Sequence, residues 1–285
     1  MLDKAPGVSS NSALQQAKRL YQAAKAGHAG TLDPLATGLL PILFGEATKF
    51  SADLLDADKS YAAEIRLGTS TTTADAEGEV IATRAVGVTA EQLAAALLRF
   101  TGGILQTPPV YSALKLAGKP LYAYARAGIA IEPEPRQVTI RALELQWFEG
   151  ERLALSVTCS KGTYIRSIAH DLGEMLGCGA HLAALRRTAV GRFSLDSAHT
   201  LESLQAMVAE ERDRCLLPLD ALLQSLPQVR LPQAQELRFV RGQAVAWEGS
   251  PQARVRVYGA SGALLGVGEA AADGTILPKR VIAAV

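Results

Sequence analysis

The sequence is poor in cysteine and in aromatic residues, and it lacks long apolar runs. Its 285 residues include three cysteines, Cys159, Cys178 and Cys215, an odd number without Cys-x-x-Cys spacing. This pattern argues against a disulfide framework or a cysteine zinc site and favours a reducing compartment. No apolar run reaches the ~18 residues of a membrane-spanning helix, and the first ten residues lack the apolar core of a signal peptide. We therefore expect a cytoplasmic globular protein without contact to a membrane.

The net charge of +1 says little about partners, but its distribution along the chain is uneven. Residues 150–192 carry six Lys or Arg against three acids, and residues 228–285 carry seven against four. Residues 196–222 carry six acids against two Arg. The two basic segments permit a polyanionic partner without requiring one, and ordinary solvated surface charge accounts for them equally well.

Hydrophobic periodicity predicts a mixture of helices and strands before residue 200. The helices are expected over residues 9–27, 89–100 with a Thr89–Gln92 capping box, and 161–177 after an extended start. The strands are expected over residues 61–69, 136–148 and 152–160. Segment 107–128 contains two adjacent prolines and then lysines among tyrosines, which predicts a loop leading into a short helix.

A break in composition around Pro227 and Pro232 separates the last part of the chain. After it, short strands joined by glycine turns are expected over residues 236–245, 253–270 and 274–283. Their spacing predicts a small β-barrel of about 55–60 residues. We therefore expect two domains, one covering residues 1–222 and one covering residues 228–285.

The segment "GHAGTLDPLATGLLPILFGEATKF", residues 27–50, places glycines and a proline around one carboxylate, Asp33. A lone Asp in such a loop is usually an Asx-turn or a helix cap. A functional role requires partners from elsewhere, and "SKGTYIRS" offers Tyr164 and Arg166. In an extended segment these two side chains share one face, which would combine a ring with a carboxylate clamp. The residues alone leave both readings of Asp33 open.

The stretch "GHAGTLDPLATGLLPI" resembles the TruB family of bacterial tRNA pseudouridine-55 synthases. Further blocks follow in the family's order: "GEATKF", "DKSY", "YSALKLAGKPLYAYAR" and "CSKGTYIRSIAHDLGEMLGCGAHLAALRR". The resemblance is strong over residues 2–195 and weak in the C-terminal part. One departure is Lys4-Ala5-Pro6-Gly7, where the family usually has Lys-Pro-x-Gly, and the short N-terminus implies a short edge strand.

The resemblance implies an α+β fold and a specific isomerisation. Its catalytic domain has a mixed, largely antiparallel sheet, a T-arm-binding insertion near residues 105–130 and a C-terminal PUA-like β-barrel. The implied reaction converts uridine to pseudouridine at position 55 in the T-loop of tRNA, after the base is flipped out. No metal or other cofactor, guide RNA or obligate protein partner is implied. The implied partner is tRNA, contacted at its T-arm and elbow.

The same resemblance assigns roles to individual residues. Asp33 matches the nucleophile, Arg166 its pairing arginine, and Tyr61 the tyrosine that stacks on the uracil and assists proton removal. The residues expected beside the base are Tyr164, Leu185 and His28. Lys4 and Lys49 are expected to support the loop or to contact phosphate. Further RNA contacts are expected from Asp75, Lys115, Lys119 and Arg126.

Three other readings compete with this one. A tRNA-binding or tRNA-folding protein on the same scaffold would do no chemistry, but it would not need Asp33 and Arg166. The second is a guide-RNA-dependent relative that acts on ribosomal RNA, but the quoted sequence motifs resemble the bacterial form more closely than that branch. A metal-dependent hydrolase is the third alternative, but the sequence contains no HxH or HExxH motif that would support it. Activity on purified tRNA without guide RNA or metal separates all three.

Overall fold

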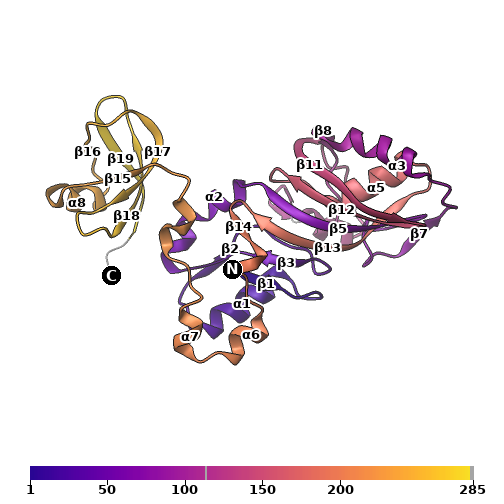
Figure 1. The fold of residues 1–285 in the computed structure, drawn as a ribbon, viewed down its shortest axis with the longest axis horizontal. Helices are drawn as coiled ribbons and strands as arrows, with labels where there is room; N and C mark the ends of the chain where they lie inside the picture. Colours follow the sequence, from indigo (N-terminus) through magenta and orange to yellow (C-terminus); the bar gives the residue numbers. More distant parts are fainter. Residues whose placement is uncertain (113, 283–285) are drawn as a thin grey trace. The chain divides into compact units, whose positions relative to one another are not determined.

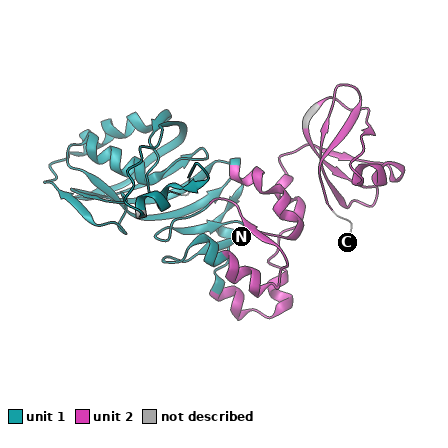
Figure 2. Ribbon diagram, turned by 180° about the vertical axis from the view of Figure 1, so that it is seen from behind, with its two compact units in different colours: residues 1–13, 31–41, 56–201 teal, residues 14–30, 42–55, 202–285 magenta. Residues whose placement is uncertain are grey.

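The computed structural model describes residues 1–112 and 114–282, which form two compact units (Figure 2). The first unit comprises residues 1–13, 31–41 and 56–201, and the second comprises residues 14–30, 42–55 and 202–285. Both units are therefore built from separate stretches of the chain. The boundary expected between residues 222 and 228 stays a prediction.

The first unit is built on an eight-stranded sheet (Figure 1). Seven strands run in the order β1 (Leu2–Lys4), β3 (Thr37–Leu40), β13 (Ala180–Val190), β5 (Lys59–Leu67), β12 (Arg152–Cys159), β11 (Arg136–Glu149) and β8 (Gly102–Gln106), and β14 (Phe193–Ser194) pairs with β13. Every neighbouring pair is antiparallel except β3 with β13. The prediction of a mixed, largely antiparallel sheet is confirmed, and β1 is the short edge strand.

Two helices, α3 (Ala90–Leu97) and α5 (Ile165–Met175), pack against this sheet and each other. Thr89 caps α3 through the predicted capping box with Gln92. In α5, Ile168 and Leu172 are buried as expected from the 3.6-residue period. The expected extended start is confirmed at Tyr164, but the helix begins at Ile165 and includes Arg166, so the extended face expected to carry both side chains does not form.

Helix α1 (Ser10–Leu20) is shorter than predicted. Ser9 Oγ accepts a hydrogen bond from Ser12 N, 3.1 Å away, and so caps the helix as expected. The chain leaves the helix at Gln22, which has a φ of 50°, and residues Ala26–His28 form β2 against β4 (Ile42–Phe44). Strand pairing has overridden the helix propensity of the alanine-rich stretch before Gly27.

The remaining elements are short. They comprise the hairpins β6 (Thr69–Thr71) with β7 (Val80–Thr83) and β9 (Lys115–Leu116) with β10 (Lys119–Pro120), the α-helices α2 (Ser51–Asp56), α4 (Leu121–Arg126), α6 (Leu201–Ala206) and α7 (Ala209–Asp213), and the 3₁₀ helices η1 (Gly45–Phe50), η2 (Leu98–Phe100), η3 (Leu195–Ser197) and η4 (Leu219–Leu223). Helix α4 confirms the short helix predicted within residues 107–128. No helix of the described chain is both long and apolar enough to cross a membrane.

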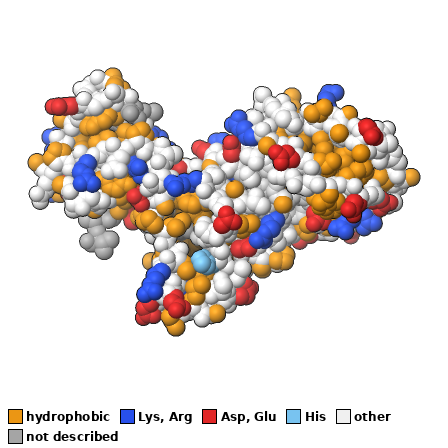
Figure 3. Space-filling model, viewed as in Figure 1, with side chains coloured by type: hydrophobic (Ala, Val, Ile, Leu, Met, Phe, Trp, Pro, Cys, Tyr) orange, Lys and Arg blue, Asp and Glu red, His pale blue; other side chains and the backbone are white. Residues whose placement is uncertain are grey.

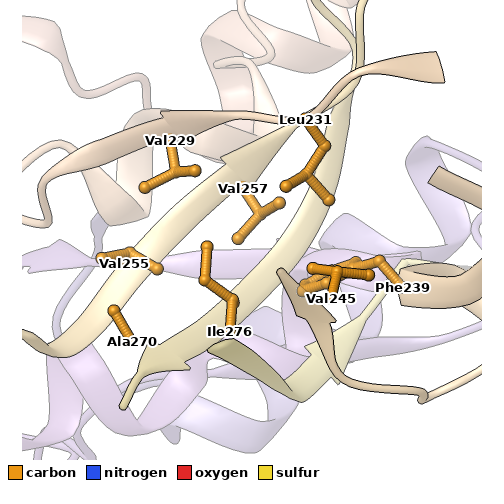
Figure 4. Close-up of a cluster of buried hydrophobic side chains, with 8 residues drawn as sticks. All are labelled: Val229, Leu231, Phe239, Val245, Val255, Val257, Ala270 and Ile276. Atoms are coloured by element: carbon orange, nitrogen blue, oxygen red, sulfur yellow. The ribbon is translucent and has the colours of Figure 1, made fainter. Parts of the chain in front are cut away.

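The C-terminal part of the second unit is a curled five-stranded sheet, which confirms the predicted small β domain as a half-barrel. Its strands run in the order β15 (Gln228–Arg230), β17 (Gln252–Tyr258), β18 (Leu264–Ala270), β19 (Thr275–Val281) and β16 (Val245–Ala246). A cluster of buried side chains fills its inside (Figure 4): Val229, Leu231, Phe239, Val245, Val255, Val257, Ala270 and Ile276.

The strand predicted over residues 236–245 is wrong for most of its length. Residues Gln233–Val240 form helix α8 after Pro232, and only Val245 begins a strand. A proline followed by Gln, Ala, Glu, Leu and Arg is a helix start, and these good helix formers outweigh the β-branched and aromatic residues nearby. The helix contributes Phe239 to the core of the curled sheet.

Candidate active site

The backbone around Asp33 is hydrogen-bonded on both sides of that residue. Ser10 Oγ donates to Leu32 O at 2.9 Å and accepts from Leu32 N at 2.8 Å. On the other side, Gly7 N donates to Pro34 O at 2.9 Å. The loop therefore presents its carboxylate from a fixed backbone, which explains the turn-forming residues around it.

Lys4 gives the loop a second support. Its buried ammonium donates to the carbonyls of Ala5 at 2.9 Å, Val8 at 2.7 Å and Pro34 at 3.3 Å. Burial is the main cause that lowers the pKa of this ammonium, and the Asp33 carboxylate opposes that shift. Of the two roles left open for Lys4, the structure shows support of the loop. Its burial argues against the alternative contact with phosphate.

Arg166 lies in the first turn of α5, and its side chain is only 4% exposed. Its Nη2 lies 3.0 Å from Asp33 Oδ2 and donates to Tyr111 O at 2.9 Å. Nη1 donates to Thr73 O at 3.2 Å, and Nε lies 3.5 Å from Asp75 Oδ2. The guanidinium is thus held in one orientation, with one edge facing Asp33.

Asp75 is not at the surface, where it was expected. Its side chain is buried, and Oδ1 accepts hydrogen bonds from Thr73 Oγ1 and from Glu77 N at 3.1 Å. The turn after β6 is further fixed by a bridge from Asp75 to Leu182 on β13. This carboxylate is anchored in the turn and pairs with Arg166, which argues against the expected RNA contact.

These surroundings raise the pKa of Asp33 above 3.8, its ordinary value. Desolvation is the largest cause, since the charged form loses water, and the negative charge of Asp75 adds to it. Arg166 and Lys4 act in the opposite direction and limit the rise. The side chain of Asp33 is 40% exposed, whereas those of its neighbours Arg166 and Asp75 are each 4% exposed, so Asp33 is the accessible member of this charged group.

Strand register brings Tyr61 and Leu185 onto one face of the sheet. In the antiparallel pair of β5 and β13, Leu185 lies opposite Ala63 and Arg187 lies opposite Tyr61. Residues two apart in a strand share a face, so Tyr61 and Leu185 are diagonal neighbours. The pKa of Tyr61 is raised mainly by burial, and the charge of Asp33 contributes to that shift. The structure thus unites three residues that lie far apart in the sequence.

Tyr164 occupies the position before α5 and is fixed through its backbone. Its N–H donates to Gln106 Oε1 at 2.7 Å, and its carbonyl accepts from Gln106 Nε2 at 2.9 Å. The Arg136 guanidinium lies over the Tyr164 ring, 5.0 Å from the ring centroid. Gln106 therefore holds the backbone that leads into Arg166. The side chains of Tyr164 and Arg166 do not share an extended face, because Arg166 is already helical.

Comparison with known proteins decides the family. The model described as "TruB family pseudouridylate synthase (N terminal domain)" matches residues 18–165. Residues 166–224 match "tRNA pseudouridylate synthase B C-terminal domain", and residues 227–282 match "Pseudouridine synthase II TruB, C-terminal". The chain belongs to the TruB family. As a member of this family it is a tRNA pseudouridine synthase, an enzyme of the isomerase class.

Curated relatives of the TruB-family chain match over nearly its full length. Each carries the name tRNA pseudouridine synthase B. The protein from Burkholderia mallei is 55% identical over 289 residues, covering 99% of this chain and 95% of the relative. Those from Cupriavidus metallidurans and Aromatoleum aromaticum are 55% and 54% identical, covering 99% and 100% of this chain and 93% and 92% of the relatives.

Solved structures agree with the TruB-family fold. A Cbf5-Nop10-Gar1 complex contains a chain that is 26% identical, with a TM-score of 0.71, covering 94% of this chain and 76% of that one. An H/ACA RNP bound to a substrate RNA containing 2'-deoxyuridine gives a TM-score of 0.75 at 23% identity, covering 99% and 84% of the two chains. The second match, at this identity, shows the fold alone.

The remaining predicted residues of this TruB-family enzyme lie on other elements of the chain. His28 lies on β2 in the second compact unit. Lys49, in the same unit, pairs with Glu46 at 2.6 Å and donates to Val281 O at 2.9 Å. Lys115 and Lys119 are exposed on the β9–β10 hairpin, whereas the side chain of Arg126 lies outside the described residues. The roles of these residues stay predictions.

Charges of both signs are interspersed on the face shown in Figure 3. Over the described residues, that face shows no uniform basic surface. In the part of the chain that the structure describes, no three or more His, Cys, Asp or Glu side chains are grouped to hold a metal ion.

Proposed function

We propose that this TruB-family enzyme converts uridine to pseudouridine at position 55 in the T-loop of tRNA, with Asp33 as the nucleophile. The observation that supports this most is the ion pair between Asp33 Oδ2 and the buried Arg166 Nη2, 3.0 Å apart. A carboxylate held by a fixed guanidinium on a fixed loop has a defined direction of attack. The reaction as proposed uses no cofactor.

In the proposed reaction the bond between uracil N1 and ribose C1′ breaks, the base turns, and a bond from C5 to C1′ replaces it. The Asp33 carboxylate supplies the electron pair that captures the electrophilic carbon while the bond to the base is broken, and it leaves with that electron pair when C5 bonds to C1′. Arg166 keeps this carboxylate ionised despite its desolvation, since a neighbouring cation favours the charged form.

The proton on C5 must leave after the new bond has formed. Tyr61 is the proposed acceptor, and its ring is proposed to stack on the uracil. Leu185, its diagonal neighbour on β13, supplies an apolar surface beside the base. Tyr164 is proposed to line the same region, supported by its backbone bonds to Gln106.

The target uridine must be extruded from the folded T-loop before it reaches Asp33. Extrusion costs a few kcal/mol, which stacking and edge contacts in the site recover. His28 is proposed to handle the flipped nucleotide and not to transfer protons. The insertion near residues 105–130 is proposed to contact the T-arm through Lys115, Lys119 and Arg126, in keeping with RNA recognition by shape and phosphates.

We further propose that residues 1–222 form the catalytic domain and that residues 228–285 form a separate domain that contacts the tRNA elbow. The buried core inside the curled sheet comes from residues 229–276, which supports a separate domain, while Val267 on β18 also packs with Phe50 and Leu223. We expect no guide RNA and no obligate protein partner, since the curated relatives share 55% identity and the Cbf5 chain shares only 26%. The three free cysteines are compatible with the reducing cytoplasm, where we expect the enzyme to act.

Asp33→Asn tests the proposal. The amide keeps the shape of the side chain but is not a nucleophile, so pseudouridine formation in purified tRNA should fall at least a thousandfold. The affinity for tRNA should change by less than threefold. Asp171→Asn is the matched control, because Asp171 is an exposed carboxylate on α5 that pairs with His170. Turnover of the Asp33→Asn variant near the parent rate would contradict the assignment.

A further inference from the structure

Arg187 is among the largest fully buried side chains in the described part of the chain, with 1% of its surface exposed. It lies on β13, two residues after Leu185, and therefore on the same face of the sheet. An arginine is almost never fully buried without partners, because removing its charge from water is costly. Its partners therefore indicate what the charge does.

The guanidinium bridges two strands of the sheet. Arg187 Nε donates to Leu39 O on β3 at 2.7 Å. On the other side Arg187 lies directly opposite Tyr61 on β5, and its guanidinium is hydrogen-bonded to the Tyr61 hydroxyl. Arginine can only donate, so the tyrosine oxygen is the acceptor.

The backbone around Arg187 is shaped for this contact. The register of β13 against β5 shifts between Arg187 and Ala189, and such a bulge re-aims the neighbouring side chains. Gly38 on β3 has a φ of 98°, and a Cβ there would lie 2.3 Å from Arg187 O. Because residue 38 is glycine, β3 can approach β13 closely enough for the Leu39 carbonyl to accept a hydrogen bond from the Arg187 guanidinium.

The charged and titratable groups near Tyr61 come from three directions. They are Arg187 on β13, Cys159 on β12 and Asp33 in its loop. Burial raises the pKa of the Cys159 thiol to about 11, so this group is neutral at physiological pH. Lys59, two residues before Tyr61 on β5, has its pKa lowered by burial and by Arg187. Among these groups, Arg187 is the cation bonded to the tyrosine oxygen.

We propose that Arg187 is a positioning residue for the isomerisation, which holds the Tyr61 oxygen beside the base and stabilises it when ionised. This rests on the proposed function, in which Tyr61 removes the C5 proton. That proton goes to the phenolate oxygen and forms the phenol, while the C–H electron pair returns to the ring. The hydroxyl proton lost beforehand goes to solvent. Arginine stays protonated throughout, so it does not compete as a base.

A double-mutant cycle tests the role in catalysis. Arg187→Lys keeps a donor but cannot reach Leu39 O and the Tyr61 oxygen with a planar fork. Its single-turnover rate on saturating tRNA should fall at least tenfold, with tRNA affinity within twofold. In a Tyr61→Phe background the same substitution should cost less than twofold more, because the group that it serves is gone. Arg186→Lys is the control, since Arg186 is an exposed neighbour paired with Asp3.

An equal loss from Arg187→Lys in both backgrounds would overturn the proposal, because Arg187 would then act without Tyr61. A second measurement does not depend on activity. The tyrosines are replaced by a fluorinated tyrosine that ionises at lower pH, and ¹⁹F NMR follows each hydroxyl. The Tyr61 signal is the one absent from Tyr61→Phe.

Its ionisation should move to higher pH in Arg187→Gln, which removes the stabilising cation. It should also move in Arg187→Lys, because a buried lysine loses its proton more readily than arginine. If Arg187→Gln does not fold, the titration of Tyr61 is measured in Arg187→Lys alone. Active wild-type enzyme with an unchanged Tyr61 titration in the folded variants overturns only the Arg187 proposal. Wild-type enzyme that forms no pseudouridine overturns the proposed function itself.

Discussion

The Arg166 guanidinium lies 3.0 Å from the Asp33 carboxylate and donates hydrogen bonds to the backbone carbonyls of Thr73 and Tyr111. Its Nε lies 3.5 Å from the buried carboxylate of Asp75, with which it forms an ion pair without a hydrogen bond. One buried cation therefore compensates two carboxylates, whose repulsion is felt by the more exposed Asp33. The direction and the ionisation of the proposed nucleophile depend on the same side chain.

Arg166→Lys should cost at least a hundredfold in the single-turnover rate. An ammonium keeps the charge, but it cannot hold Asp33 and both carbonyls in one plane. Affinity for tRNA should stay within threefold, as measured by filter binding. Arg84→Lys is the control, because Arg84 pairs with Glu174 on the exposed surface. If lysine works as well as arginine at residue 166, the clamp has been assigned wrongly.

Asp33→Asn should raise the melting temperature at pH 7. The folded protein raises the pKa of this carboxyl, so its contribution to stability is present at low pH and is lost as the pH rises through the folded pKa. Asparagine removes the cost of the desolvated charge at neutral pH. The gain should shrink as the pH falls towards 3.8, the ordinary pKa of an aspartate. Thermal unfolding followed by circular dichroism at several pH values checks this, and a lower melting temperature at pH 7 would refute it.

Asp75→Asn should move the acid limb of the pH–rate profile to lower pH. The charge of Asp75 raises the pKa of Asp33, and asparagine removes that charge while keeping an oxygen for Thr73 and Glu77. Single-turnover rates on prefolded tRNA across the acid range measure the shift. Asp58→Asn, at an exposed carboxylate paired with Arg141, should leave the profile in place. An acid limb that stays in place in Asp75→Asn would show that the two carboxylates are not coupled.

Lys4→Met and Lys119→Met should differ in their dependence on salt. Lys119 is exposed on β10, and loss of a phosphate contact lowers the slope of log affinity against log salt by roughly 0.7–0.9. Lys4 is buried, so its loss should leave the slope unchanged. It should instead destabilise the fold by about 1–3 kcal/mol, since three carbonyls each lose one hydrogen-bond donor. Affinity for tRNA at four salt concentrations and thermal unfolding of both variants measure these effects. A reduced slope for Lys4→Met would contradict its burial.

Local patterns predicted those elements whose own residues decide their structure. The alternation of Ala63, Ile65 and Leu67 on β5 and the capping box of Thr89 are of this kind, and both are confirmed. Strand β13, at the centre of the site, escaped prediction because it carries buried Arg187 where an apolar residue is expected. Its place is decided by strand pairing with β5 and β3, which no short window of sequence contains.

Much less of the site followed from residue types alone. The partnership of Asp33 with Arg166 was inferred from resemblance, since their spacing carries no signal and the expected extended face of Tyr164 and Arg166 does not form. Nothing in the sequence marks Gln106 as the residue that holds Tyr164, because a single amide has no pattern. Burial of lone charges such as Lys4 depends on tertiary packing in the same way.

The order in which the two units use the chain constrains how the protein can fold during synthesis. The stretches on either side of the Asp33 loop, residues 14–30 and 42–55, belong with residues 202–285, which are synthesised after residues 56–201. The loop itself runs into β3, which pairs with Arg186 and Arg187 on β13. Neither unit can therefore fold completely while only its N-terminal stretches have been synthesised. Contacts that these stretches form before their native partners exist must be exchanged later. The site around Asp33 can be completed only after Arg187 on β13 has been made.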